Sequence, residues 1–198
     1  MNTPNLDEDE LVHLALHASR EHLPDEAMGY LKRAVEAFPA SAKAHYLLGA
    51  EHAQIGMVER AVEEMSEAVR LDPTLSTAQF QLGLLHFTAG RRREAELAWT
   101  PLDKLGRTDP LYLFKRGLLH WLDDEPAACV SDLEQGIANN SFSEPLNEDM
   151  RRVLRDVQSS GSSGTARPAA HGTQGPSEPA THALLSAYQK NRDKSERE

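Results

Sequence analysis

A pattern of small and bulky residues recurs every 34 positions in this chain, and it constrains the fold more than any other feature of the sequence. Gly49 returns as Gly83 and Gly117, and Ala15 stands in the same place one period earlier. A second small position and a bulky position four residues later recur with the same period: Ala27, Ala61, Ala95 and Cys129, then Leu31, Met65, Trp99 and Leu133. Small residues let two helices approach closely, and bulky ones fill the space beside them. The period therefore predicts an array of stacked helix pairs.

The arrangement of Leu48, Gly49, Ala61, Met65 and Pro73 resembles the tetratricopeptide repeat, a helix–turn–helix unit. The resemblance covers roughly residues 8–140, which is four units. It implies an all-α fold, a right-handed solenoid of four helix pairs followed by a C-terminal capping helix. It implies little about function, because this fold is a scaffold that hosts many roles.

The 198 residues divide into a repeat domain and a tail. We expect a tetratricopeptide repeat domain over 1–158, with repeats and capping helix at 8–41, 42–75, 76–109, 110–143 and 144–158. In the first two repeats the expected helices are 8–21, 24–37, 42–55 and 58–71. Pro24 suits the first position of its helix, and Ser41 is expected to cap the next one.

The third and fourth repeats depart from the family pattern. Pro101 falls inside an expected helix, where it removes a hydrogen bond, so we expect that helix to be bent or to end near Thr100. An irregular turn is expected over 105–109. In the fourth repeat Arg116 replaces an expected leucine and Gly136 an expected alanine, which leaves the packing there open.

Composition changes sharply after the repeats. Residues 159–177 are mostly serine, glycine, proline, alanine and threonine, which predicts a flexible linker. Within the final segment, 178–198, a short amphipathic helix is expected over 181–192, with Leu184 and Tyr188 four residues apart. We expect either that this tail contacts the repeat domain intramolecularly or that it is solvated. The segment 159–164 reads equally as native or as an engineered linker.

Charge and composition narrow the partner class. The net charge is −10, and such a surface repels phosphate backbones, so nucleic acid is not expected as a partner. No apolar run reaches the ~20 residues of a membrane span, and the N-terminus lacks the pattern of a signal peptide. The single cysteine, Cys129, makes no internal disulfide, which fits a reducing compartment. We expect a cytoplasmic protein.

A second apolar stripe runs along the first helix of every repeat, at spacings of i, i+4 and i+7 on one helix face. In tetratricopeptide repeat proteins these positions line a concave groove. The predicted groove positions are Val12, Leu16, Tyr46, Ala50, Phe80, Leu84, Phe87, Phe114, Leu118 and Trp121. The alternative is that these residues are simply core. The lysines and asparagines by which one variety of the family binds a C-terminal carboxylate are absent from this stripe.

The sequence gives no sign of catalysis, cofactor or metal. It has no phosphate-binding glycine loop and no ordered nucleophile–base set. His52, His86 and His120 recur at the repeat period, where the family usually has a packing tyrosine. We expect them to be half-buried and hydrogen-bonded across a helix pair rather than to share a metal, because neighbouring helix axes lie about 8–10 Å apart. Cys129 is expected to act as a small buried residue.

We therefore expect a non-enzymatic adaptor or chaperone. It would bind a protein segment with apolar anchors and basic flanks. The alternatives are a structural subunit of a larger assembly, a homo-oligomer, and a chaperone of the bacterial secretion type.

Overall fold

The structure is a computed structural model that describes residues 6–162, with side chains to residue 159. The predicted linker beyond Ser162 and the predicted tail helix lie outside the described residues. Within them the fold is all-α, and no strand is present. The chain divides into two compact units, Met1–Ala78 (unit 1) and Gln79–Glu198 (unit 2), and each is described here by itself.

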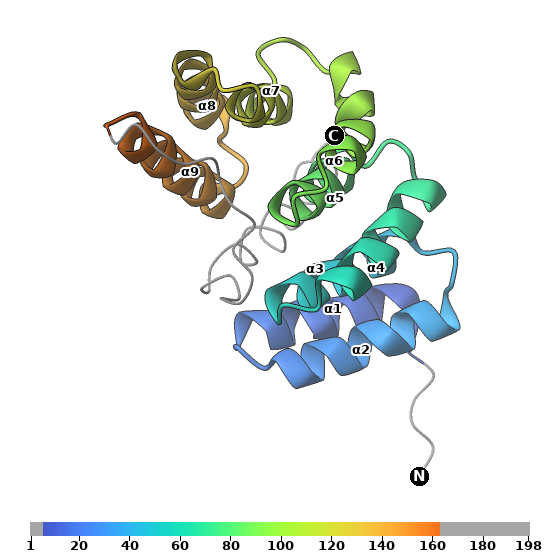
Figure 1. The fold of residues 1–198 in the computed structure, drawn as a ribbon. Helices are drawn as coiled ribbons and strands as arrows, with labels where there is room; N and C mark the ends of the chain where they lie inside the picture. The colour runs from blue at the N-terminus through green and yellow to red at the C-terminus, as the bar shows by residue number, and fades with distance from the viewer. Residues whose placement is uncertain (1–5, 163–198) are drawn as a thin grey trace. The chain divides into compact units, whose positions relative to one another are not determined.

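Unit 1 contains two helix pairs. The first pair is α1 (Glu8–Arg20) with α2 (Pro24–Ala37), and the second is α3 (Ala42–Gln54) with α4 (Val58–Leu71). The helices of each pair pack against one another, and α2 also packs against α3 (Figure 1). The four helices begin and end within one residue of the predicted limits.

Local sequence explains where these helices begin. Asp7 accepts a hydrogen bond from the Glu10 backbone N–H at 2.8 Å, and Glu10 reaches back to the Asp7 N–H at 2.9 Å, which forms a capping box. The predicted cap Ser41 accepts from the Ala44 N–H at 3.0 Å. Gly56 turns the chain between α3 and α4 with a φ of +76°, a conformation that glycine adopts at little cost.

Unit 2 contains most of α5 (Ser76–Thr88), whose first three residues belong to unit 1, and the elements that follow it. These are α6 (Arg92–Trp99), the 3₁₀ helix η1 (Thr100–Lys104), α7 (Pro110–Leu122), α8 (Pro126–Asn139) and α9 (Glu144–Ser162). Helix α8 packs against both α7 and α9. Helix α9 begins where the capping helix was predicted and runs four residues past Gln158.

The predicted break at Pro101 is confirmed. Helix α6 ends at Trp99 and the chain continues as 3₁₀ helix η1, followed by a turn to Asp109. The Thr100 N–H donates to the Leu97 carbonyl, which has no donor from Pro101. The buried Lys115 amine lies 3.4 Å from the Trp99 carbonyl oxygen and 2.6 Å from Asp103 Oδ1. A side chain of α7 therefore stabilises the end of α6.

The two departures in the fourth repeat have a structural reason. Arg116 forms a bidentate ion pair with Asp132, which joins α7 to α8 with charge where the family has a leucine. A Cβ at Gly136 would lie 2.5 Å from Cδ1 of Phe114, so the Phe114 ring occupies the space that an alanine side chain would need. Both substitutions thus accommodate α7–α8 packing.

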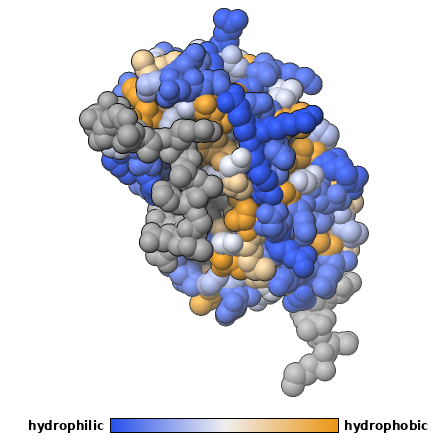
Figure 2. Space-filling model, in the orientation of Figure 1, coloured by the Kyte–Doolittle hydropathy of each residue, from blue (hydrophilic) through white to orange (hydrophobic). Residues whose placement is uncertain are grey.

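Hydrophilic residues cover most of the face seen in Figure 2, with smaller hydrophobic patches between them. In the part of the chain that the structure describes, no helix is both long and apolar enough to cross a membrane.

Candidate functional site

Five aromatic side chains of unit 2 form a continuous series of ring contacts. The Phe87 ring lies 6.0 Å from both Trp121 and Trp99, measured between centroids. Trp99 lies 6.0 Å from Phe80, which lies 6.2 Å from Phe114. Such distances fall in the range where aromatic pairs stabilise each other by about 0.5–1.5 kcal/mol beyond the area they bury. The series links α5, α6 and α7 into one core.

Trp99 holds this series in place. Its indole N–H donates to the backbone carbonyl of Phe80 at 2.9 Å. A Cβ at Gly83 would lie 2.1 Å from the indole nitrogen, so only glycine leaves room for the ring. The repeat pattern identified Trp99 as a packing residue but did not connect it with the stripe. The sequence did contain a signal for this connection, because Trp99 stands where the other repeats have leucine or methionine.

The predicted groove positions differ in exposure. Seven are buried: Val12, Leu16, Tyr46, Ala50, Phe80, Phe114 and Leu118. They include every predicted groove position of unit 1. The other three are partly buried and pack against the core of unit 2: Leu84, Phe87 and Trp121. A partner could therefore reach these three side chains without any rearrangement. We call Leu84, Phe87 and Trp121 the α5–α7 surface.

A buried carboxyl lies beside the stripe in unit 1. Glu51 of α3 is buried, and its Oε1 has no hydrogen-bond partner. Burial raises the pKa of this carboxyl, and a hydrogen bond with Ser19 opposes that effect. Sequence reasoning missed Glu51, since nothing in the repeat pattern marks a carboxyl there as buried.

Unit 1 also contains a pocket of 610 Å³ that none of the predicted groove positions lines. Its walls come from α2, α3, α4 and the α3–α4 turn. The apolar part of its lining consists of Pro24, Met28, Val35, Leu48, Ile55 and Met57. The volume falls in the range of about 300–1,000 Å³ that is typical of ligand sites.

His52 is the buried polar side chain of this pocket. It is 6% exposed, and its Nδ1 has no hydrogen-bond partner. Burial is the main reason why its pKa is lowered, against the opposing effect of Glu64. The expectation of a hydrogen bond across the helix pair is therefore wrong for Nδ1 of His52.

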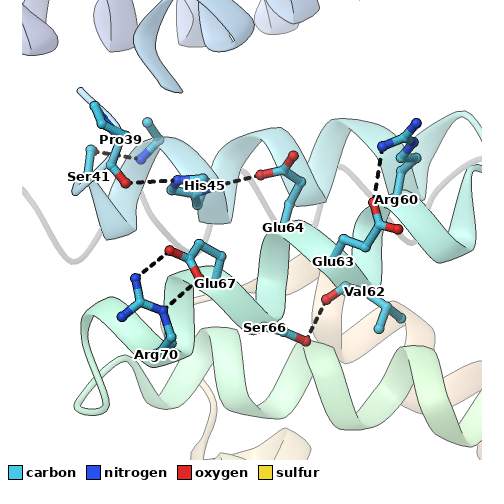
Figure 3. A network of polar contacts seen from close by, with 11 residues as sticks. Pro39, Ser41, His45, Arg60, Val62, Glu63, Glu64, Ser66, Glu67 and Arg70 are labelled. Carbon is cyan, nitrogen blue, oxygen red and sulfur yellow. Dashed lines mark hydrogen bonds and ion pairs between the residues drawn. The ribbon is translucent and has the colours of Figure 1, made fainter. Parts of the chain in front are cut away.

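Charged side chains surround the pocket: Asp25, Lys32, Glu36, Arg60 and Glu64. Two of them already have partners. Glu64 points toward His45, with 2.7 Å between Oε2 and Nδ1, and Arg60 pairs with Glu63 at 3.1 Å (Figure 3). These pairs lie within α4 or between α3 and α4.

Two further residues singled out in the sequence, His120 and Cys129, contact only neighbouring parts of the fold or are buried in it. His120 lies 2.6 Å from Glu125 and 3.5 Å from Asp132 of α8, in agreement with the expected contact across a helix pair. Cys129 is buried, which raises the pKa of its thiol to about 11 and makes it unreactive. Over residues 6–162, no group of three histidine, cysteine or acidic side chains could hold a metal ion.

Comparisons with known proteins agree with this architecture. Residues 42–75 match the model of the tetratricopeptide repeat. No curated protein sequence matches the chain significantly.

Several solved structures share the fold. A structure of MamA from Desulfovibrio magneticus RS-1, from residue 41 to its end, is 14% identical, with a TM-score of 0.59 over 96% of this chain and 96% of that chain. A crystal structure of MamA is 21% identical, with a TM-score of 0.57 over 67% of this chain and 77% of that one. At these identities the likeness is one of fold. Residues 42–75 therefore form a tetratricopeptide repeat, and the 34-residue pattern and the paired helices show that the described chain has the helical fold of such repeats.

Proposed function

We propose that this protein is an adaptor that binds an apolar or amphipathic segment of a partner protein at the α5–α7 surface. Repeat proteins of this kind present extended surfaces for binding other proteins. The observation that carries the proposal is the contact between Phe87 and Trp121, two partly exposed rings from different helices with centroids 6.0 Å apart.

The α5–α7 surface has the composition of an energetically important binding site. Aromatic residues, tryptophan above all, are enriched among the residues that dominate binding energy. Phe87 packs on the buried Trp99, and Trp121 packs on Phe87, so both rings are supported by the core. Binding on preformed rings costs little conformational entropy. The net charge of −10 favours a segment with basic flanks.

The buried residues of the predicted groove could contact a partner only after a rearrangement of the fold. Contact with Phe80, Phe114 or Leu118 would require whatever buries them to move. We also propose that the chain's own tail can occupy the groove. A chaperone role would use the same binding surface. If the tail competes with a partner, truncation after Ser162 should tighten partner binding several-fold.

The decisive experiment compares wild type with Trp121→Glu and Phe87→Ala in affinity capture, followed by binding measurements on the purified partner. Loss of one well-placed aromatic anchor weakens binding by about tenfold or more. The control is Leu97→Glu, because Leu97 is a large apolar residue of α6 that is 65% exposed and lies outside the stripe.

Partners lost with Trp121→Glu but retained by Leu97→Glu would support the proposal. If all three variants bind like wild type while keeping wild-type circular dichroism, the α5–α7 surface is not the binding site. If these substitutions instead dissociate an oligomer seen by sedimentation, the surface belongs to a permanent assembly and the protein is a structural subunit.

A further inference from the structure

The pocket of unit 1 combines an apolar interior with apolar side chains at its edge. Leu48 is buried in its floor, with Met28 and Val35 partly buried beside it. At the edge, Ile55 is 50% exposed and Met57 is 46% exposed. They are two of the four large hydrophobic residues that the described chain leaves well exposed. Exposed apolar side chains gathered at one concavity are typical of a binding site.

His52 gives this apolar pocket a single unused polar group. Its Nδ1 is buried without a partner among the described residues, an arrangement that is costly in a folded protein. Burial lowers its pKa below the ordinary value of 6.5, so the ring is neutral at pH 7 and offers one donor and one acceptor. A peptide group presents the complementary N–H and C=O.

The charges on α2 indicate which charges a bound segment would carry on either side of its apolar side chain. Asp25 and Glu36 both line the pocket, and within residues 6–162 neither forms an ion pair. They are 11 positions apart in α2, which corresponds to about 16 Å at 1.5 Å per residue. Lys32 stands between them in sequence. On the opposite wall, Arg60 and Glu64 are already paired. The two ends of the α2 wall therefore favour positive charge.

We propose that this pocket is a second docking site, which takes an extended segment of a partner protein with an aliphatic side chain at its centre and a basic residue on either side. The aliphatic side chain would contact Met28, Val35 and Leu48, and a peptide group would hydrogen-bond to His52. An extended chain rises about 3.3 Å per residue and presents alternate side chains on one face, so lysines four positions apart lie about 13 Å apart on the same face as the central aliphatic residue. The long lysine side chains can span the remaining distance to Asp25 and Glu36. The flexible methionines allow the pocket to adapt to different aliphatic side chains.

The test uses the full chain with labelled methionine and isoleucine methyl groups, titrated with acetyl-Lys-Ala-Leu-Ala-Lys-amide and followed by NMR. The methyl signals of Met28, Ile55 and Met57 should shift and saturate, while those of Met65 and Ile137 should stay. The same peptide with glutamate in place of both lysines should bind several-fold more weakly at low salt. Salt should reduce that difference, because it screens exposed charges.

Three variants separate this site from the α5–α7 surface. The double variant Ile55→Gln with Met57→Gln should weaken binding about tenfold, and it introduces no charge that could attract the peptide. Leu97→Gln, the matched exposed control, and Phe87→Ala should bind the peptide like wild type. Loss of the shifts in Phe87→Ala would place the peptide at the α5–α7 surface and overturn the inference. The absence of saturable shifts at Met28 and Met57, equal binding by the double variant, or equal binding of the two peptides at low salt would also overturn it.

Discussion

At the scale of single residues, Gly83 is the described glycine with the least room for a side chain, because tryptophan fills the space beside it. Gly83 of α5 faces the indole of Trp99, and the Phe80 carbonyl one turn earlier accepts the indole N–H. The ring is thus held by a steric fit and a hydrogen bond at once. Because the Phe87 ring also contacts that indole, the position of a partly exposed residue depends on a buried glycine.

Gly83→Ala should destabilise the protein strongly. The added Cβ would lie 2.1 Å from Nε1 of Trp99, and the rigid indole cannot move without losing its hydrogen bond. We expect a loss of about 3 kcal/mol in the free energy of unfolding, the upper part of the range for overpacked cores. Urea denaturation followed by tryptophan fluorescence measures it.

Gly29→Ala is the matched control, because Gly29 lies within α2 and a Cβ there would have no atom within 4 Å. Replacing this helical glycine should stabilise unit 1 by about 0.5–1 kcal/mol, measured by circular dichroism because both tryptophans lie in unit 2. If Gly83→Ala unfolds at the same urea concentration as wild type, the fit between Gly83 and Trp99 is not as tight as described.

At the scale of elements, the break after Trp99 decides how the third repeat ends. Pro101 stops α6, and the chain passes into η1 instead of completing a second helix of the length seen in α2 or α4. At this break the Trp99 carbonyl accepts a hydrogen bond from a buried amine, Lys115 of α7, whose charge is paired with Asp103. A helix of the fourth repeat thereby stabilises an irregularity of the third.

Lys115→Met should test that role. Methionine retains the apolar stem but removes the amine, so the Trp99 carbonyl and the Asp103 carboxylate lose their donor. Breaking a buried hydrogen bond to a charged group costs about 1–3 kcal/mol. Lys104→Met is the control, because Lys104 is exposed in η1. Equal urea midpoints for the two variants would show that Lys115 does not stabilise the break.

At the scale of the whole molecule, two buried groups in different units should respond to acid in opposite ways. In unit 1, burial lowers the pKa of His52, so stability is lost as the pH falls below 6.5. In unit 2, burial raises the pKa of Asp149 on α9 to about 6, against the opposing effect of Arg152. Oδ1 of Asp149 has no hydrogen bond, and Arg152 lies 3.5 Å away.

The prediction concerns Asp149, because both tryptophans lie in unit 2 and report its unfolding. A raised pKa means that the folded state binds the proton more tightly. Its stabilising effect is complete below the ordinary pKa of the carboxyl and is lost as the pH rises through about 6. At pH 7.5, Asp149→Asn should therefore be more stable than wild type by about 3 kcal/mol.

The advantage of Asp149→Asn should shrink as the pH falls from 7.5 toward 4.5. Glu134→Gln, an exposed change on α8, should show no such trend. An advantage that is independent of pH would mean that the amide gains a contact of its own rather than relieving a buried charge.

The sequence alone determined the features that depend on neighbouring residues. Helix limits follow from caps, prolines and glycines, so Ser41, Pro24 and Pro101 could be interpreted without knowledge of the fold. The 34-residue pattern determined that the helices pair, because small residues at fixed places are required wherever two helices approach closely. These signals are local or periodic, and both kinds can be recognised in a single sequence.

Only the tertiary structure decided which apolar residues are accessible. The sequence gives Phe80 and Phe87 the same role, since both lie on one face of one helix. The structure buries the first and leaves the second partly exposed. It also placed His52 without a partner in a pocket whose lining comes from three helices and a turn. Burial and hydrogen bonding depend on residues distant in the chain, and no local pattern records which of them will be neighbours in the fold.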